Sequence, residues 1–304
     1  MAIAKAPMQR RILITGASGF VGSRTIEPLI QRGFEVHTFG RRAPQNPAVS
    51  HHNGDCLAKA DVTGVLDGVR PAYVLHCAWE VTHGEFWSAP ENLDWVSATL
   101  LMARAAQSVG VKRFVGLGTC AEYAWMSRET SPKRETDKLG SSTLYGISKS
   151  ATYKVLHHYF SGGPASFAWA RLFHLFGAGE NKARFVPSLT KNLSEGKSAN
   201  CRHGQLVRDF LSVEDCGAAI AAVVDSSIVG AVNVGSGQGV TLATLARTIA
   251  RNLGREGMLR VEELPTHEPY TMVADTGRLR REVGYAIDTD PLRHFKASNT
   301  LSCR

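Results

Sequence analysis

Short apolar runs alternate with amphipathic segments along the first half of the chain. Runs that predict β-strands cover residues 11–15, 35–39, 72–78, 112–119 and 165–173. Segments with helical spacing cover residues 20–33, about 90–109 and about 145–160. Buried strands that alternate with helices are typical of βαβ units and of a parallel sheet covered on both faces. We therefore predict an α/β fold built on a doubly wound parallel sheet.

The pattern changes after about residue 173. The segment 176–197 mixes glycine, proline and charge ahead of a short helix, and residues 207–225 predict a strand followed by a helix. Residues 230–235 predict a strand that returns to the main sheet. Residues 241–254 predict an amphipathic helix with one apolar face, formed by Leu242, Leu245, Ile249 and Leu253. We expect a first domain over residues 1–173 and a smaller, interleaved lobe over 174–304.

Length and composition fit an ordinary globular protein. The 304 residues suit one large α/β unit or two closely joined domains. Hydrophobic residues make up 43% and charged residues 20%, and no stretch approaches eighteen consecutive apolar residues, so no membrane span is expected. The basic residues 1–11 lead directly into an apolar strand, and we interpret them as a short tail.

Cysteine spacing and charge narrow the classes of function. None of the six cysteines forms a CxxC pair or a zinc pattern, so we expect no metal site and free thiols in a reducing cytoplasm. We interpret the cysteines as small buried hydrophobic residues, and the alternative is that one of them is a nucleophile. The net charge is +8, but the basic residues are dispersed, so no nucleic-acid partner is expected. The cysteines are Cys56, Cys77, Cys120, Cys201, Cys216 and Cys303.

A glycine-rich turn joins the first strand to the first helix. The sequence TGASGFVG places Gly16, Gly19 and Gly22 there. Gly16 permits a tight turn, Gly19 lets the backbone approach a pyrophosphate, and Gly22 lets the helix pack close to the sheet. The free N–H groups at the helix start would face the anion. We predict that this loop, with Ser18, Phe20 and Val21, binds a dinucleotide; an ordinary tight turn is the alternative.

The end of the second strand indicates which dinucleotide is bound. NAD sites usually have an acidic residue there, which holds the ribose hydroxyls. Here the strand is followed by Arg41 and Arg42, and two guanidinium groups can pair with a 2′-phosphate. This favours NADP over NAD, unless both arginines are only solvated loop charges. A further strand is expected just before NGDC (residues 53–56), and Asp55 and Cys56 in that sequence are candidates for the adenine end.

A threonine, a tyrosine and a lysine form a candidate proton-transfer set. If Tyr145 opens a helix, Lys149 lies one turn along the same face. We expect the ammonium of Lys149 to lower the pKa of Tyr145. Tyr145 would then donate a proton to a substrate carbonyl, or remove one in reverse. Thr119 ends a strand at the carboxyl edge of the sheet, where its hydroxyl would polarise the same carbonyl.

The motifs TGASGFVG, YGISK and RDFLSVEDCGAAI together resemble the extended short-chain dehydrogenase/reductases, a Rossmann-like group that includes the NAD-dependent epimerase/dehydratases of nucleotide sugars. The resemblance runs from about residue 11 to 290. It implies that Tyr145 is the proton donor or acceptor, that Lys149 binds the nicotinamide ribose, and that Thr119 holds the substrate oxygen. The same resemblance places two further groups at the ligands. His76, Cys77 and Ala78 would lie beside the cofactor, and the substrate would contact Cys120, Arg208 and the segment 177–187 with Arg184 and Val186.

The sequence departs from the family pattern in four places. Sugar 4,6-dehydratases carry an Asp-Glu pair after the active-site threonine; here Cys120 and Ala121 stand there, so dehydration is not expected, and Glu122 is expected to point elsewhere. His174 replaces an asparagine that contacts the diphosphate in many relatives. No arginine is evident near Pro265, where many relatives bind phosphate. The pair Arg41-Arg42 does not suit an epimerase that retains NAD.

These features lead us to expect an NADPH-dependent reductase of a keto group, with the 4-keto group of a nucleotide-activated deoxysugar as the substrate. The alternatives are an NAD-dependent nucleotide-sugar epimerase, a reductase of a small non-sugar carbonyl, and a non-catalytic dinucleotide-binding sensor. The resemblance also implies a homodimer that pairs through the helix carrying Tyr145. Trp79, Phe86 and Trp87 are either packing aromatics or the lining of a substrate pocket.

Overall fold

A computed structural model describes residues 10–126, 130–287, 290 and 292–296 of the chain, so the tail 1–9 and Cys303 lie outside it. Seven parallel strands form the central sheet in the order β10-β6-β5-β4-β1-β2-β3. This confirms the predicted doubly wound sheet. The strands are β1 Arg11–Thr15, β2 Glu35–Gly40, β3 Ser50–Asn53, β4 Tyr73–His76, β5 Arg113–Thr119, β6 Ser166–Leu172 and β10 Gly230–Val234.

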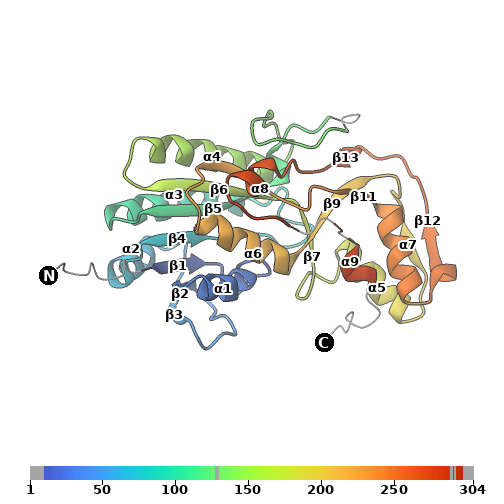
Figure 1. The fold of residues 1–304 in the computed structure, drawn as a ribbon, viewed down its shortest axis with the longest axis horizontal. Helices are drawn as coiled ribbons and strands as arrows, with labels where there is room; N and C mark the ends of the chain where they lie inside the picture. The colour runs from blue at the N-terminus through green and yellow to red at the C-terminus, as the bar shows by residue number, and fades with distance from the viewer. Residues whose placement is uncertain (1–9, 127–129, 288–289, 291, 297–304) are drawn as a thin grey trace.

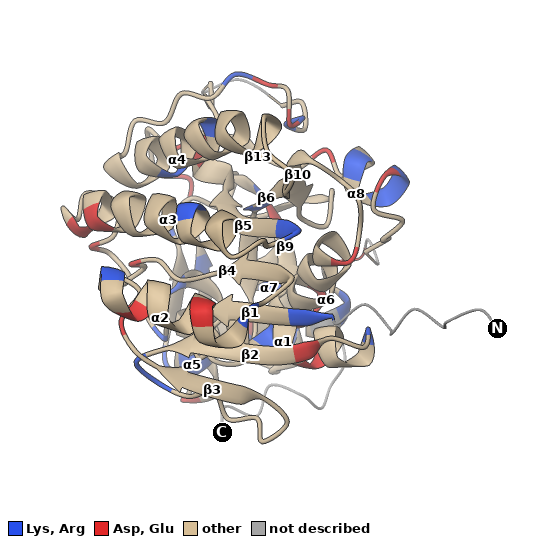
Figure 2. Cartoon of the chain, turned by 90° about the vertical axis from the view of Figure 1, so that its left-hand side faces the viewer, with Lys and Arg blue, Asp and Glu red and all other residues tan. Residues whose placement is uncertain are grey.

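Helices cover both faces of the sheet (Figure 2). One face packs against α1 (Gly22–Gln31), α6 (Val213–Val224) and α8 (Gly277–Arg281), and the other against α2 (Lys59–Val69), α3 (Glu91–Ser108) and α4 (Leu144–Ser161). Successive residues of a strand point to opposite faces, so Ile12 and Ile14 enter the first layer and Leu13 enters the second. Both faces are therefore buried, which explains why the strands are continuously apolar.

A smaller lobe lies at one end of the molecule (Figure 1). It holds a four-stranded sheet of β7, β9, β11 and β13, a two-stranded sheet of β8 and β12, and the helices α5, α7 and α9. The four residues predicted for the apolar face of α7 pack into its core. The bounds are β7 His174–Phe176, α5 Phe185–Ser194, β8 Ala199–Cys201, β9 Val207–Ser212, β11 Gly239–Thr241, α7 Leu242–Asn252, β12 Leu259–Val261, β13 Thr271–Met272 and α9 Arg293–Lys296.

The chain passes between the two parts more than once. The predicted return of a strand near residue 230 is confirmed, because β10 pairs with β6 in the main sheet. One detail of the prediction was wrong: α5 begins inside the segment 176–197 instead of after it. Pro187 is tolerated there because it is the third residue of the helix, where backbone N–H groups have no partner within the helix.

Among the described residues, no helix is both long enough and apolar enough to cross a membrane.

Candidate active site

The glycine-rich loop between β1 and α1 leaves no room for side chains. Gly16 has a φ of 68°, and a Cβ atom on it would lie 2.7 Å from the backbone nitrogen of Ala78. A Cβ atom on Gly22 would lie 2.2 Å from the carbonyl oxygen of Gly16. Ser18 and Gly19 are exposed, and no side chain among the described residues caps the start of α1. The loop therefore presents backbone N–H groups at a helix start, an arrangement that fits a dinucleotide pyrophosphate.

The turn after β4 lies directly against this loop. His76 is locked there, because its Nδ1 atom lies 2.8 Å from Thr15 Oγ1 and its Nε2 atom 3.0 Å from Thr99 Oγ1. Burial lowers the pKa of His76 to about 3, so the ring is neutral. The Ala78 N–H donates to Thr15 Oγ1 at 3.3 Å. Cys77 and Ala78 thus border the loop, at the point where the strand order reverses between β1 and β4.

The basic pair lies at the same edge of the sheet. Arg41 and Arg42 follow β2 directly and are exposed. Arg41 lies close enough to Cys56 to favour its thiolate, although burial dominates and raises the pKa of that thiol to about 12. Asp55 accepts a hydrogen bond from the Leu57 N–H at 3.0 Å. Because β2 and β3 are paired, the two arginines and Asp55-Cys56 emerge side by side.

Thr119, Tyr145 and Lys149 come together beside this edge. Thr119 ends β5, and its Oγ1 atom accepts a hydrogen bond from the Ala121 N–H at 3.2 Å. The helix α4 begins at Leu144, after a Thr143 cap, so Tyr145 lies in its first turn and Lys149 one turn later. The side chain of Thr119 lies close enough to Tyr145 to favour its phenolate. The Lys149 ammonium donates to the Leu117 carbonyl at 2.9 Å.

The expected effect of Lys149 on Tyr145 was wrong. Burial raises the pKa of Tyr145, and this outweighs the lowering by the Thr119 hydrogen bond and by the positive charge of Arg184. Lys149 itself has its pKa lowered to about 7 by burial. Its ammonium lies 3.7 Å from the centre of the Trp79 ring but 6.0 Å from that of Tyr145. Tyr145 is therefore a protonated phenol at neutral pH, which is the form that donates a proton.

Aromatic side chains account for the burial of Tyr145. The ring centre of Phe86 lies 4.8 Å and that of Trp87 5.9 Å from the centre of the Tyr145 ring, both edge to face. The Tyr145 N–H also donates to the Trp87 carbonyl at 3.1 Å. Phe86 is buried, whereas Trp87 is 44% exposed. Phe86 and Trp87 therefore pack on Tyr145, as the first interpretation of these aromatics expected.

On the lobe side, Arg184 faces the proton-transfer set. Its positive charge acts on Tyr145 and on His174, and among the described residues no carboxylate lies within 4 Å of it. Burial lowers the pKa of His174 to about 3. The Nδ1 atom of His174 is buried and has no hydrogen-bond partner in the described part of the chain. Arg184 and His174 therefore retain capacity for a ligand.

Arg208 and Val186 are placed differently from Arg184. Arg208 is 3% exposed, and its guanidinium lies 2.8 Å from a carboxylate oxygen of Glu268 and 2.9 Å from the carbonyl oxygen of Pro269. Cys120 lies within electrostatic range of Arg208, and burial raises the pKa of its thiol to about 12, which disfavours a nucleophilic role. Val186 is buried in the lobe core. Arg208 is thus already held by protein groups.

Two acidic residues near the site were missed from the sequence. Glu180 lies in the segment 177–187; burial raises its pKa to about 7, and its Oε2 atom is buried without a partner among the described residues. Its position in that segment was the signal that could have found it. Glu268 gives no such signal, because it lies 60 residues from Arg208 in the sequence.

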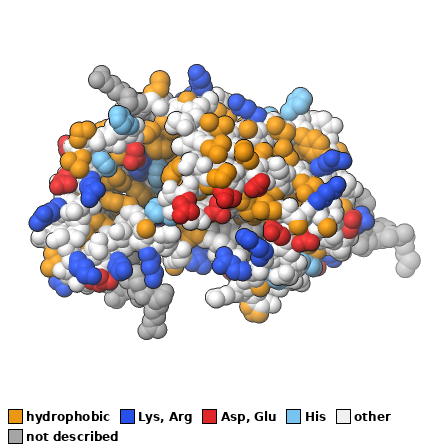
Figure 3. Space-filling view, turned by 180° about the vertical axis from the view of Figure 1, so that it is seen from behind, with side chains coloured by type: hydrophobic (Ala, Val, Ile, Leu, Met, Phe, Trp, Pro, Cys, Tyr) orange, Lys and Arg blue, Asp and Glu red, His pale blue; other side chains and the backbone are white. Residues whose placement is uncertain are grey.

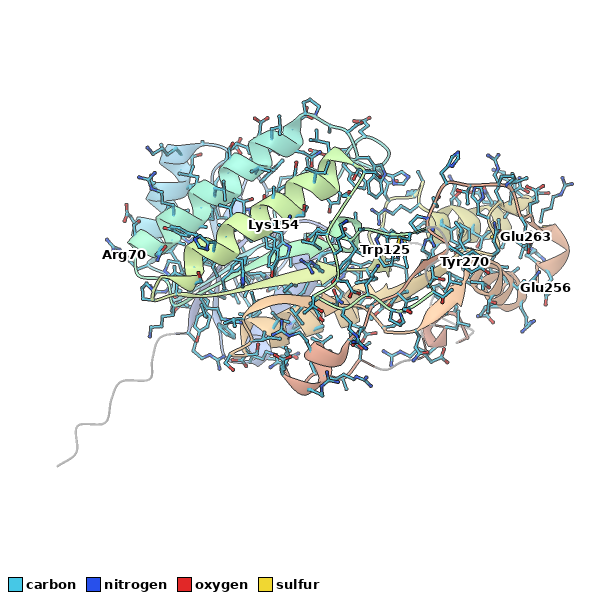
Figure 4. All side chains as sticks on the ribbon, turned by 90° about the horizontal axis from the view of Figure 1, so that it is seen from above. Arg70, Trp125, Lys154, Glu256, Glu263 and Tyr270 are labelled. Carbon is cyan, nitrogen blue, oxygen red and sulfur yellow. The ribbon has the colours of Figure 1, made fainter. Side chains whose placement is uncertain are left out.

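The site lies where the sheet meets the lobe. Trp125, on the sheet side of this junction, donates its indole N–H to the Cys120 carbonyl at 2.8 Å (Figure 4). Tyr270, on the lobe side, accepts a hydrogen bond at its carbonyl from Arg208 at 3.3 Å (Figure 4). Seen from behind, the molecule is hollowed on the side of the lobe, and Lys and Arg side chains border the hollow (Figure 3).

Comparison with known proteins identifies the family. The family model described as "NAD dependent epimerase/dehydratase family" matches residues 12–235. A UDP-glucose 4-epimerase of Rhizobium leguminosarum is 26% identical, over 92% of this chain and 93% of its own length. A dTDP-6-deoxy-L-talose 4-dehydrogenase (NAD(P)(+)) of Kitasatospora kifunensis is 28% identical, over 80% of this chain and 79% of its own length.

Solved structures agree with this fold. The UDP-N-acetylglucosamine 4-epimerase of Methanobrevibacter ruminantium superimposes with a TM-score of 0.83 at 20% identity, over 95% of this chain and 96% of its own. The Bordetella bronchiseptica enzyme WbmG in complex with NAD has a TM-score of 0.79 at 25% identity, over 95% of this chain and 92% of its own. The chain belongs to the NAD-dependent epimerase/dehydratase family of extended short-chain dehydrogenase/reductases, whose members use a nicotinamide dinucleotide.

Proposed function

We propose that this protein is an NADPH-dependent reductase that acts on the 4-keto group of a nucleotide-activated deoxysugar. The observation that carries the proposal is the position of Tyr145, buried at the start of α4 beside Thr119 at the carboxyl end of β5. A phenol within hydrogen-bond reach of a bound ketone can donate the proton that a reduction requires. The relative named as a dTDP-6-deoxy-L-talose 4-dehydrogenase supports the substrate class, because its reverse reaction is a 4-keto reduction.

The side chains around Tyr145 suggest how the reduction proceeds. The glycine-rich loop and the turn after β4 would hold a nicotinamide cofactor, which would supply the hydride when bound. Thr119 donates a hydrogen bond to the ketone oxygen and orients the carbonyl. Tyr145 would give its hydroxyl proton to the ketone oxygen as the carbonyl carbon is reduced. The positive charge of Arg184 favours the phenolate that would remain until solvent returns the proton.

The preference for NADP rests on Arg41 and Arg42. Both follow β2 at the edge where the ribose of the adenosine would lie, and both are exposed and able to move. A guanidinium group pairs well with a phosphate dianion. The strand ends without a carboxylate that would hold the 2′-hydroxyl of NAD.

We further propose that Arg184 is the main cation for the substrate diphosphate, with Arg208 as a second. Arg184 is half-buried at the start of α5 and faces the site. Arg208 would have to exchange its contact with Glu268 for the diphosphate. That exchange is feasible because the side chain of Glu268 is 59% exposed and returns to water at little cost.

A second candidate function is an NAD-dependent nucleotide-sugar epimerase. It is favoured by the relatives named as UDP-glucose 4-epimerases, which match over about nine-tenths of this chain. An epimerase oxidises and re-reduces its substrate, so it should retain NAD through purification. A reductase consumes its cofactor and should release it.

Cofactor affinity tests the proposal. We expect the purified protein to release no NAD and to bind NADPH at least about tenfold more tightly than NADH in calorimetric titrations, since two charge-assisted pairs to a phosphate are involved. Arg41→Ser with Arg42→Ser should remove this preference. Lys112→Ser is the matched control, because Lys112 is exposed at the opposite edge of the sheet. Release of NAD, or equal binding of NADH, would favour the epimerase over the reductase.

We also propose a cytoplasmic homodimer. Leu93 on α3 and Ile147 and Val155 on α4 are exposed apolar residues, which supports pairing through these helices. Among the described residues the five cysteines are free thiols, as a reducing compartment would favour.

A further inference from the structure

Glu122 is a fully buried carboxylate three residues after Thr119. It ends the short 3₁₀-helix η1 (Cys120–Glu122) that follows β5, and its side chain is inaccessible to solvent. It closes a capping box: Thr119 Oγ1 accepts from the Ala121 N–H, and Glu122 Oε1 accepts from the Thr119 N–H at 2.9 Å. Glu122 therefore points away from the ligand edge, as expected, and yet holds the backbone of Thr119.

Two further side chains donate hydrogen bonds to this carboxylate. Trp169 donates its indole N–H to Oε1 at 2.9 Å, and Arg171 donates its Nε–H to Oε2 at 2.8 Å. The strand makes room for this contact at Gly118, where a Cβ atom would lie 2.4 Å from Glu122 Oε1 and 2.2 Å from Trp169 Nε1. Three donors thus fix both oxygens, and the side chain has no freedom to turn.

Stability alone does not explain a charge in this position. Moving an ion pair out of water costs about as much as the pair regains, and apolar residues of similar volume are often as stabilising. A second nitrogen of Arg171, Nη1, donates to the Tyr123 hydroxyl and to the Glu135 carbonyl. The charge of Glu122 is therefore better explained by its electrostatic effect on neighbouring side chains.

Both titrating members of the proton-transfer set lie within the electrostatic field of Glu122. The negative charge of Glu122 raises the pKa of Tyr145 because it opposes the phenolate, and it raises that of Lys149 because it favours the ammonium. The other groups that act on Tyr145 are Thr119, Cys120 and Arg184. On Lys149 the other group is Cys77, and Lys149 in turn acts on His76.

We propose that Glu122 is a positioning residue that fixes Thr119 through its backbone and whose buried charge acts on Tyr145 and Lys149. In the proposed reaction Tyr145 gives its proton to a ketone oxygen. The direction of proton transfer rests on the proposed function, whereas the action of Glu122 on the two side chains does not.

Titration of Lys149 by NMR tests this without a substrate. In protein labelled with ¹³C at lysine Cε, the Lys149 signal should titrate near pH 7, whereas ordinary lysines titrate near about 10.4. The signal is assigned by its absence in Lys149→Met. Glu122→Gln keeps an oxygen for the Thr119 N–H but removes the charge. We expect its Lys149 midpoint to fall by about half a pH unit or more, and the ¹³Cζ signal of Tyr145 to titrate at lower pH.

Glu135→Gln is the matched control. Glu135 is a half-buried carboxylate that accepts a hydrogen bond from the Asn233 N–H at 2.8 Å, and no effect of it on Lys149 or Tyr145 is resolved. An unchanged Lys149 midpoint in Glu122→Gln, or an equal shift in Glu135→Gln, would overturn the proposal. If Glu122→Gln does not fold, Glu122→Asp keeps the charge and should leave Lys149 titrating near its original midpoint.

Hydrogen exchange in the unaltered protein provides a second measurement. The Thr119 amide should exchange slowly, because its N–H donates to a buried carboxylate. Rapid exchange there would refute the positioning role. Neither measurement needs turnover, so failure to reduce a keto sugar would count against the proposed function and leave this inference open to its own test.

Discussion

Lys149 illustrates how strongly one buried charge depends on its immediate partners. Its ammonium has a backbone carbonyl at 2.9 Å and the face of an indole ring at 3.7 Å, while Glu122 acts on it from further away. A cation over an aromatic face and a charge-assisted hydrogen bond each offset part of the lost hydration. Burial still dominates, since the pKa is lowered to about 7. Lys149 is thus maintained at a cost to stability, as functional groups often are.

This cost predicts a pH-dependent stability. The folded protein releases the Lys149 proton near pH 7 and the unfolded chain near 10.5, so the unfolded chain binds more protons between these values. The stability of the natural protein should therefore rise with pH across this window through Lys149. Lys149→Met lacks the effect, and its free energy of unfolding should exceed that of the natural protein by about 1–3 kcal/mol at pH 7, with the gain vanishing towards pH 10.5.

Denaturant unfolding at several pH values measures this difference. Lys154→Met is the control, because Lys154 is exposed on the same helix (Figure 4) and should give a difference that does not change with pH. A constant offset for Lys149→Met over the whole window would mean that Lys149 is not a buried cation with a lowered pKa.

At the scale of elements, the sequence was informative wherever the signal was local. Most strands of the main sheet are short apolar runs next to glycine or to helical periodicity, so their places in the chain could be predicted. The exception is β3, whose polar sequence SHHN has no such pattern. The two- and three-residue strands β8, β12 and β13 have no such pattern, because distant partners define them. The same limit applied to the site: the rings that bury Tyr145 come from a loop about sixty residues earlier, so the direction of its pKa shift was missed.

The glycine-rich turn allows a prediction at this scale. Gly22→Ala would place a methyl group 2.2 Å from the Gly16 carbonyl oxygen, so the loop must shift. We expect at least about a tenfold loss of dinucleotide affinity and about 1–3 kcal/mol of destabilisation. Gly64→Ala is the matched control, since Gly64 is exposed within α2 with open space around it. This substitution should raise the free energy of unfolding by about 0.5–1 kcal/mol. Calorimetric titration and denaturant unfolding measure both effects.

At the scale of the whole molecule, the two parts depend on each other at the site. Tyr145 and Thr119 come from the main sheet and α4, whereas Arg184 comes from the start of α5 in the lobe. The view from behind shows apolar side chains gathered away from the lobe, above a row of acidic ones (Figure 3). A second copy that covers exposed apolar residues of α4 would also brace the helix that carries Tyr145 and Lys149.

Oligomeric state can therefore be tested together with the site. Ile147 and Val155 lie two turns apart on α4 and are 49% and 52% exposed. We expect the natural protein to have twice the 32.9 kDa mass of one chain in light scattering, and Ile147→Asp with Val155→Asp to be monomeric. The matched control is Val229→Asp with Leu264→Asp, because these residues are 55% and 43% exposed but lie off α3 and α4.

The outcomes differ in what they say about α4. A monomeric natural protein would refute the homodimer, and a dimer that survives the Ile147 and Val155 substitutions would place the contact on another surface. If the double variant is monomeric, its melting temperature should fall and lose its dependence on protein concentration, because association no longer stabilises the fold. Its cofactor affinity should stay within about twofold, since the glycine-rich loop and Arg41 lie at the edge of the sheet and not on α4. A larger loss would mean that the contact between copies orders the cofactor site itself.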